Sequence, residues 1–258
     1  MFSNLIQTNL TTRILGKKIE QFTWTESTNN DAWTLIDEGT HEGTVVITDK
    51  QTAGKGRGGR SWVSVPGKSL TATIVLKPVM ESRFSGWLPL MTGVAIVDTF
   101  AELGLAAELK WPNDIMVVDK KLGGILCESR VHGQTLAWAV IGIGLNINEQ
   151  GNELPEDLNA TSFFSERGSS IQRELVLAMI LNILEQLYIS LKETKDTSTL
   201  ADQWTDHCNH VDKTVKFKSG NESLSGEFIG INENGAAIIQ TNGNEHTYTS
   251  GDIHLIRS

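Results

Sequence analysis

The spacing of apolar residues along the chain predicts a sheet of short strands with helices packed against it. Leu70–Leu76 is an apolar and β-branched run, which is typical of a buried strand. In residues 87–103, and again in residues 171–191, the apolar positions recur every three or four residues, which predicts amphipathic helices. The acidic side chains late in the second helix, from Glu185 to Glu193, are expected to face solvent.

Tight polar turns, rather than helices, separate the other strand-like runs of the first 209 residues. Strands joined by short turns are antiparallel, whereas parallel neighbours need a long crossover. The sequence therefore predicts an α+β domain with a mixed or antiparallel sheet and helices on one face. The other predicted strands of this domain cover residues 44–48, 108–111, 115–118, 124–127 and 136–147.

A different pattern begins after Asp206, where short strands recur about every ten residues. Turns rich in Asn and Gly separate these strands, as in hairpins. The pattern predicts a small β-barrel, so we divide the chain into a larger domain, residues 1–209, and a barrel, residues 210–258. The predicted barrel strands cover residues 215–218, 224–228, 236–239 and 245–248.

Composition and charge narrow the class of protein. The chain has 258 residues and a net charge of −9, which argues against a protein that coats nucleic acid with a broadly basic surface. Its two cysteines, Cys127 and Cys208, are too few for a disulfide framework. The N-terminus lacks the pattern of a signal peptide, and no apolar run approaches the ~18 residues of a membrane span. We therefore expect a cytoplasmic protein with no membrane partner.

A basic, glycine-rich loop stands out against this acidic composition. Residues 50–80 contain no Asp or Glu but six Lys or Arg, and four of these cations lie within residues 50–60 among four glycines. Glycine lets backbone N–H groups approach an anion, and Arg can donate two parallel hydrogen bonds to a carboxylate or phosphate. The loop therefore predicts an anion-binding site, although a solvated basic loop fits the local sequence equally well. A dinucleotide-binding fingerprint at Gly54, Gly56 and Gly59 is disfavoured because no helix start follows them.

Two further segments place charged residues beside predicted strand ends. Within residues 110–114 (KWPND), Pro112 favours a turn on which Asn113 and Asp114 could bind a metal ion or orient an amine. Lys121 stands just before a pair of glycines, where a strand leaves room for a ligand. Its ammonium group would suit a carboxylate or a developing phosphate charge. A plain turn and an exposed lysine at a bulge are the alternatives.

Taken together, five segments resemble the biotin protein ligase family in their order and residues. They are residues 26–29 (ESTN), 51–62 (QTAGKGRGGRSW), 110–114 (KWPND), 121–126 (KLGGIL) and 142–147 (GIGLNI). The resemblance spans about residues 20 to 150, and the C-terminal barrel looks like the SH3-like domain that these ligases carry. It implies a catalytic domain similar to that of class II synthetases. One departure is Lys55, which stands where many members have arginine and lacks the bidentate geometry of arginine.

The resemblance implies an ATP-dependent, AMP-forming ligase that uses Mg²⁺. The enzyme would activate biotin as biotinyl-5′-AMP with release of pyrophosphate, and then transfer biotin to a lysine of a biotin carboxyl carrier protein. A homodimer would be compatible with the family. Some members carry an N-terminal DNA-binding module, but only 26 residues precede Ser27, so we expect the monofunctional type and no DNA partner.

Site residues follow from the same resemblance, each at the matching position of this sequence. The residues expected to hold biotin are Ser27, Thr28, Asn29, Gln51, Gly54, Lys55, Gly56, Arg57, Lys121 and Gly124. Those expected to serve ATP or the adenylate are Arg57, Arg60, Trp62, Asn113, Asp114, Lys121 and Asn146. Lys121, Arg57 and Asp114 are expected to take part in catalysis, and the sequence assigns no residue to a metal ion.

Three other functions stay open on the sequence alone. A lipoate or octanoate ligase would share the fold and the adenylate chemistry, although residues 54–62 and 121–124 favour biotin. A non-catalytic biotin sensor would use the same pocket. A scaffold protein whose barrel binds peptides would leave the cationic glycine loop unexplained.

Overall fold

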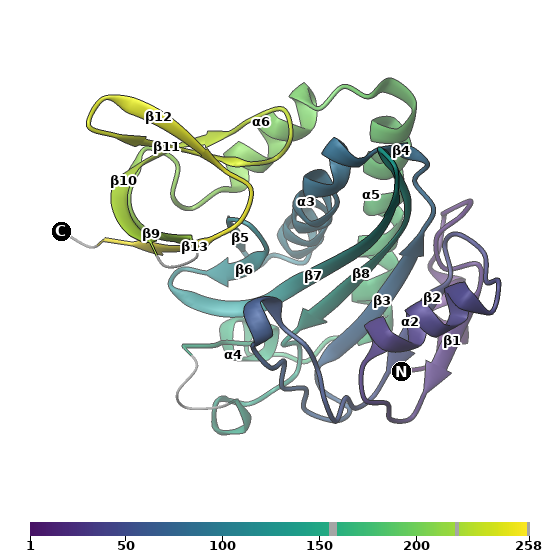
Figure 1. Ribbon diagram of the computed structural model, residues 1–258. Helices are drawn as coiled ribbons and strands as arrows, with labels where there is room; N and C mark the ends of the chain where they lie inside the picture. The colour runs from purple at the N-terminus through teal and green to yellow at the C-terminus, as the bar shows by residue number, and fades with distance from the viewer. Residues whose placement is uncertain (155–158, 220–221, 257–258) are drawn as a thin grey trace.

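The computed structural model confirms the predicted α+β architecture and describes residues 1–154, 159–219 and 222–256 (Figure 1). Within these residues, eight strands form one sheet in the order β1-β2-β3-β8-β7-β6-β5, with β4 beside β8. The sheet is mixed because β1 and β2 run parallel while their neighbours run antiparallel. The strands are β1 (Ile19–Phe22), β2 (Val45–Thr48), β3 (Leu70–Leu76), β4 (Met80–Glu81), β5 (Glu108–Lys110), β6 (Asp114–Val117), β7 (Lys120–His132) and β8 (Thr135–Leu145).

Two long helices, α3 (Trp87–Glu102) and α5 (Arg173–Thr194), cover one face of the sheet, as their periodicity predicts (Figure 1). Helix α3 packs against both the sheet and α5, so it is buried around most of its circumference. By length and composition, Ser82–Glu102 and Arg173–Thr194 could each cross a membrane, yet 72% and 56% of these apolar windows are buried inside the protein. Both are therefore accounted for as core helices.

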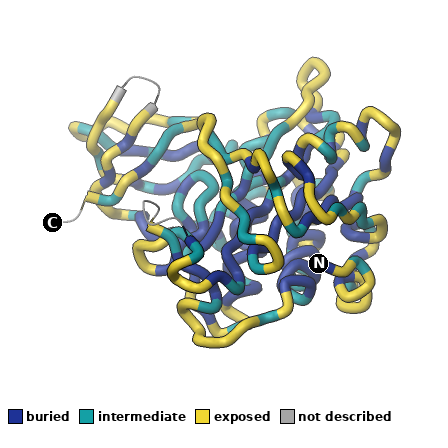
Figure 2. The backbone as a smooth tube through the Cα atoms, turned by 90° about the horizontal axis from the view of Figure 1, so that it is seen from below, coloured by how far each residue is buried: buried dark blue, intermediate teal, exposed yellow. Residues whose placement is uncertain are grey.

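Helix α2 (Thr28–Asp37) packs on the opposite face of the sheet, an arrangement that the periodicity did not predict. Alternate residues of a strand point to opposite faces, so Val46 meets Ala32 and Ile36 of α2 while Val45 faces the larger core. Buried residues accordingly concentrate in the sheet and its helices, and the connecting loops are exposed (Figure 2). The shorter helices are α1 (Ser3–Thr8), α4 (Phe163–Arg167) and α6 (Ser198–His207), with 3₁₀ turns at η1 (Arg57–Gly59), η2 (Ser82–Gly86) and η3 (Gly151–Glu153).

Glu185 of α5 lies in the interior, so the expectation that it faces solvent is wrong. The residue is 5% exposed, and its carboxylate accepts hydrogen bonds from the backbone N–H groups of Arg13, Ile14 and Leu15, the last two at 2.8 and 2.7 Å. The N-terminal segment crosses α5 at this point, and its backbone donors would lack acceptors without this carboxylate. Glu193, one residue before the end of α5, is exposed as expected.

The C-terminal β-domain is a five-stranded antiparallel sheet in the order β12-β11-β10-β9-β13 (Figure 1). Four of its strands match the predicted runs, and β13 is additional. The predicted division between residues 209 and 210 falls in the turn between α6 and β9; residues 257–258 lie outside the described residues. The strands are β9 (Lys213–Ser219), β10 (Glu222–Ile231), β11 (Ala237–Thr241), β12 (Asn244–Tyr248) and β13 (Asp252–Leu255).

Two buried tryptophans attach the β-domain to the larger domain. Trp87 donates its indole N–H to the backbone oxygen of Glu233 at 2.7 Å, and Trp111 donates to the backbone oxygen of Gly235 at 3.2 Å. Gly86 completes the contact, because a β-carbon there would lie 2.5 Å from the backbone oxygen of Asn234. The turn between β10 and β11 is therefore fixed against the start of α3 and the KWPND segment.

Candidate active site

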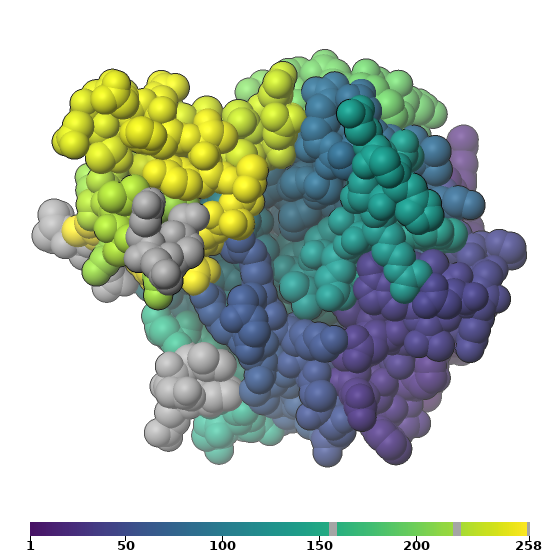
Figure 3. Space-filling view, viewed as in Figure 1, coloured from purple at the N-terminus to yellow at the C-terminus, as the bar shows by residue number. Residues whose placement is uncertain are grey.

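A cavity of about 810 Å³ opens on the same face of the sheet as α2. Its floor consists of β3, β7 and β8, and its walls are the start of α2, the glycine loop and the turn between β5 and β6, with His254 of β13 at the rim. This volume is in the range of small-molecule sites. In Figure 3 the loop, in blue, lies against the yellow β-domain. Of the residues predicted to bind biotin or ATP, all but Gly54 line this cavity.

Neutral polar side chains gather at the end of the cavity next to α2. The side-chain oxygen of Gln51 accepts hydrogen bonds from the backbone N–H of Thr28 at 2.8 Å and from its hydroxyl at 3.1 Å. The Thr73 hydroxyl lies within hydrogen-bond distance of the Thr28 hydroxyl, at 2.7 Å, and of the side-chain oxygen of Asn29, at 2.8 Å. Because the Gln51 oxygen is already bonded twice, its amide nitrogen is the group that remains to meet a ligand. Ser27 lines the same end and is 2% exposed.

The glycine loop forms a narrow hairpin that is held by its own backbone. The backbone N–H of Trp62 donates to the backbone oxygen of Gly54 at 2.8 Å, and the backbone N–H of Gly56 donates to the backbone oxygen of Arg60 at 2.7 Å. A β-carbon on Gly54 would lie 2.5 Å from the backbone oxygen of Trp62 and 2.8 Å from the amide nitrogen of Gln51. Gly54 is therefore required for the close approach of the two arms, although it does not itself line the cavity.

Two glycines of β8 make room for side chains that lie over the floor. A β-carbon on Gly142 would lie 2.4 Å from the side-chain oxygen of Asn29, and one on Gly144 would lie 2.5 Å from the indole ring of Trp62. The Trp62 ring therefore covers the middle of the floor. Its indole N–H is buried and has no hydrogen-bond partner among the described residues.

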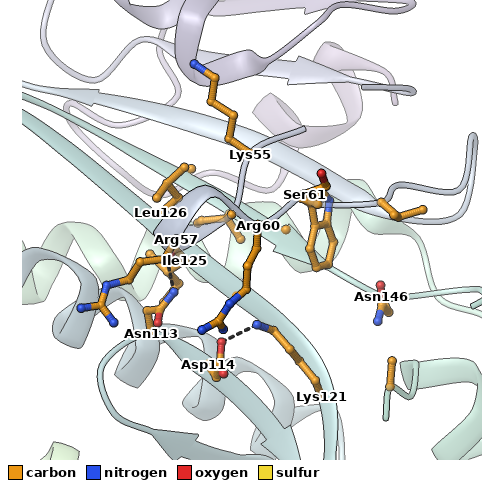
Figure 4. Close-up of a pocket in the computed structure, with 18 of the residues that line it drawn as sticks. Lys55, Arg57, Arg60, Ser61, Asn113, Asp114, Lys121, Ile125, Leu126 and Asn146 are labelled. Atoms are coloured by element: carbon orange, nitrogen blue, oxygen red, sulfur yellow. Dashed lines mark hydrogen bonds and ion pairs between the residues drawn. The ribbon is translucent and has the colours of Figure 1, made fainter. Parts of the chain in front are cut away.

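The cations of the loop have protein partners of their own. Arg57 donates to the backbone oxygen of Gly251 at 2.8 Å, and Arg60 forms an ion pair with Asp252, so both bind β13 or the residue just before it. Burial lowers the pKa of Arg57, and the nearby Asp252 opposes this shift. Lys55 lines the cavity, but its ammonium group bonds Asn30 of α2 at 2.7 Å and points away from Arg60 and Lys121 (Figure 4).

Lys121 and Asp114 form an ion pair at the other end of the floor (Figure 4). The end of the Lys121 side chain would lie 3.4 Å from a β-carbon on Gly124, so this glycine leaves space beside the ammonium group. Asn113 donates its amide to the backbone oxygen of Ile125 at 2.8 Å, and Asn146 donates to that of Thr161 at 2.9 Å. The amide nitrogens of Asn113 and Asn146 thus hold the cavity wall together through hydrogen bonds to the backbone.

The lining residues to which the sequence assigned no role include Lys110, Thr71 and His254. Lys110 belongs to the KWPND segment but was assigned no role; burial lowers the pKa of its amine, and the nearby Asp114 opposes this shift. Thr71 looks like any other residue of strand β3, and His254 comes from a strand that was not predicted. The position of Lys110 in a charged motif was a usable signal, whereas only the folded structure brings the other two into the cavity.

The cavity fits a metal ion that arrives with a nucleotide better than a resident one. In the part of the chain that the structure describes, no three His, Cys, Asp or Glu side chains are grouped so as to hold a metal ion. Mg²⁺ usually takes one or two carboxylates and completes its shell with phosphate oxygens and water. Asp114 is the lining carboxylate that sits among the cations of the cavity, so it suits that role.

Both parts of the chain match the models of known protein families. The model of the Biotin/lipoate A/B protein ligase family matches residues 20–146. The model of the Biotin protein ligase C terminal domain matches residues 210–255. The two matches cover the cavity-forming sheet and the C-terminal β-domain, respectively.

Individual relatives resemble the chain over nearly all of its length. The Bifunctional ligase/repressor BirA of Bacillus subtilis is 31% identical over 253 residues, which are 97% of this chain and 78% of that protein. The Biotin--[acetyl-CoA-carboxylase] ligase of Mycobacterium tuberculosis is 27% identical over 93% of this chain and 90% of its own length. The solved structure of the biotin protein ligase from Aquifex aeolicus in complex with biotin and ATP superposes with a TM-score of 0.78 and 28% identity, covering 94% of this chain and all of that one.

Proposed function

The chain belongs to the biotin protein ligases of the Biotin/lipoate A/B protein ligase family, and we propose that its cavity is where biotin and ATP react. The observation that carries this proposal is the division of one cavity into a neutral polar end and a cationic end. Five cations line the cavity, namely Lys55, Arg57, Arg60, Lys110 and Lys121, against two lining carboxylates, Asp114 and Asp119. A third carboxylate, Asp252, pairs with Arg60. The surplus of positive charge suits a site for two anionic substrates.

The heterocycle of biotin fits the neutral end of the cavity. Its ureido group has N–H donors and a carbonyl acceptor but no charge, so it calls for a few aimed polar groups rather than for ions. Ser27, Thr28 and the amide nitrogen of Gln51 supply such groups. Hydrogen bonds among Thr28, Gln51 and Thr73 hold this end in place before a ligand binds.

Adenylation takes place at the cationic end. A carboxylate oxygen of biotin attacks the α-phosphorus of ATP; the new P–O bond forms as the bond to the β-phosphate oxygen breaks, and pyrophosphate leaves. Lys121 and Arg57 would bring the two anions together and stabilise the charge on the phosphorus, because fixed cations in a partly dry site need no reorganisation. Mg²⁺ held by the phosphates and Asp114 would neutralise the departing pyrophosphate. The indole ring of Trp62 offers a flat apolar surface for adenine.

Transfer of biotin follows in the same place. The amine of the carrier lysine attacks the acyl carbon, the C–N bond forms, the bond from that carbon to the phosphate oxygen of AMP breaks, and AMP leaves. Asp114 is positioned to orient the amine and to take its proton, since it lies beside Lys121 where the anhydride would form. The acceptor is a biotin carrier of a carboxylase, in keeping with the relatives named biotin--[acetyl-CoA-carboxylase] ligase.

The direct test is to mix the purified chain with biotin, ATP and Mg²⁺ and to measure the mass of the complex under native conditions. We expect a bound biotinyl-adenylate, ATP–pyrophosphate exchange that biotin stimulates and lipoate does not, and labelling of a carrier lysine. Exchange driven by lipoate instead would favour a lipoate ligase. A tight biotin complex without exchange would favour a sensor.

Several expectations from the sequence stay predictions. These are the cytoplasmic location, the dependence on Mg²⁺, the compatibility with a homodimer, and the absence of DNA and membrane partners. The roles of individual residues in binding and catalysis are proposals of the same kind, and substitutions at Thr71, Gly144, Lys121 and Arg57 test the main ones.

A further inference from the structure

Two threonines of β3 differ in how their hydroxyl groups are used. Thr71 and Thr73 lie two residues apart and therefore point to the same face of the sheet. The Thr73 hydroxyl is fully engaged with Thr28 and Asn29. The Thr71 hydroxyl is buried, the residue is 3% exposed, and it has no hydrogen-bond partner among the residues that the structure describes. Buried hydroxyls are rarely left unpaired, so this one requires an explanation.

Thr71 lies on the floor of the cavity, next to the neutral end. It lines the cavity and pairs with Gly144 across the β3–β8 ladder, beside the Trp62 ring. One step along the same face of the ladder, Thr73 pairs with Gly142, over which Asn29 lies. The Thr71 hydroxyl thus lies on the same face of β3 as Thr73, one step beyond the polar groups that form the neutral end of the cavity.

The cationic end lies on the other side of β8. Gly144 pairs with Gly124 of β7, and the ammonium group of Lys121 lies over Gly124. Two strand spacings therefore separate Thr71 from the place where the phosphates would bind. The hydroxyl is therefore set apart from the phosphates and lies beside the neutral end, where the heterocycle of the acid substrate would bind.

We infer that the Thr71 hydroxyl bonds a polar atom of the heterocycle of biotin and selects biotin against acids with a hydrocarbon chain, such as octanoate and lipoate. This inference rests on the proposed function of the cavity. All three acids share a carboxylate, but only biotin carries N–H and C=O groups at its far end. A hydrocarbon chain would leave the hydroxyl buried without a partner, and sites built to hydrogen-bond a substrate reject analogues that lack the matching group.

The test is the near-isosteric substitution Thr71→Val, compared with Thr71→Ser and with Thr99→Val. Thr99 is a matched control because it is also fully buried, while its hydroxyl bonds the backbone oxygen of Ala95 within α3, outside the cavity. Binding of biotin and of octanoate is measured by titration calorimetry, and melting temperatures of the free proteins by calorimetric scanning.

We expect Thr71→Val to weaken biotin binding about five- to tenfold, because one hydrogen bond to the ligand is lost. Octanoate binding should stay unchanged or tighten. The melting temperature of the free variant should equal or exceed that of the wild type, since the unpaired hydroxyl is gone. Thr71→Ser should keep the wild-type preference, and Thr99→Val should leave both affinities unchanged.

Two results would overturn the inference while leaving the proposed function intact. Biotin binding by Thr71→Val at wild-type strength would show that the hydroxyl meets no part of the ligand. Equal weakening of biotin and octanoate would place the contact on the shared carboxylate and remove the role in selection. Failure of the wild-type protein to bind biotin at all would instead refute the proposed function, and this inference with it.

Discussion

The indole ring of Trp62 covers the α-carbon of Gly144, so closely that a β-carbon would lie 2.5 Å from the ring. The contact couples the end of the glycine loop to the central strand β8. It also holds an aromatic surface in the middle of the cavity, between the neutral and the cationic ends. Any side chain at position 144 must therefore push the ring away.

We predict that Gly144→Ala displaces Trp62 and raises the KM for ATP about fivefold or more, since stacking a base on an aromatic ring contributes about 1–3 kcal/mol. Gly151→Ala is the control, because a β-carbon there meets nothing within 4 Å. Steady-state kinetics with varied ATP measures the effect. An unchanged KM for ATP in Gly144→Ala would mean that the ring does not serve the nucleotide.

Lys121→Ala is expected to reduce biotin-dependent ATP–pyrophosphate exchange about 100-fold or more, because a fixed charge next to the reacting phosphorus is lost. The substitution also leaves Asp114 without its ion-pair partner. Lys120→Ala, at the exposed neighbouring position, provides the control. Near-normal exchange by Lys121→Ala would exclude the assigned role.

Arg57→Ala is expected to release the adenylate before transfer. Arg57 joins the loop to the start of β13 through Gly251, so its loss should loosen the wall that keeps water and foreign amines from the anhydride. The assay is biotin labelling of lysines on an added bystander protein such as albumin, with Lys77→Ala, outside the cavity, as the control. Bystander labelling no higher than that of wild type would refute this shielding role.

Glu149 predicts a pH dependence of stability. The residue is fully buried, one of its carboxylate oxygens has no hydrogen-bond partner among the described residues, and burial raises its pKa although Ser69 donates to it. The native state therefore holds this proton more tightly than the unfolded chain does. As the pH rises above 4.5, the ordinary pKa of a glutamate, the group lowers the free energy of unfolding. Glu149→Gln should raise the melting temperature, and by more at pH 8 than at pH 5. A difference that does not vary with pH would contradict this assignment.

Glu185→Ala should destabilise the fold by about 3 kcal/mol or more, because three backbone donors lose a charged acceptor. Glu193→Ala, on the exposed part of the same helix, should change the free energy of unfolding by less than about 0.5 kcal/mol. Urea denaturation of both variants measures the difference. Similar values for the two would show that the contacts of Glu185 contribute little.

Motifs and strands that are defined by residues close together in the chain could be predicted from the sequence. The glycine loop, the KWPND turn and the lysine before paired glycines are each recognisable within about a dozen residues, and the predicted strands correspond to observed ones. Strands β1, β4 and β13 were not predicted, because each is short and none of them contains two consecutive apolar residues. The fold class needed only the spacing of apolar positions.

Features that depend on distant segments could not be predicted. Period two places Thr71 and Thr73 on one face, but only the folded loop shows that this face bounds a cavity. Glu185 has the polar character of a surface residue, and its acceptor role arises because a segment about 170 residues earlier crosses α5. In both cases the decisive neighbour is far along the chain, where local patterns carry no information.

The hydrogen bonds across the junction between the two domains are accepted mostly by atoms that every amino acid possesses. Trp87, Trp111 and Arg57 all donate to main-chain oxygens of the β-domain, and the Arg60–Asp252 pair adds a side-chain contact on that side. A substitution at Glu233 would leave its acceptor in place as long as the backbone path persists, whereas a β-carbon on Gly251 would lie 2.3 Å from the ring of Phe217. The hydrogen bonds of this junction therefore depend on the path of the β-domain backbone, so an insertion or deletion in its turns should disturb the reaction centre more than a substitution of an exposed side chain there.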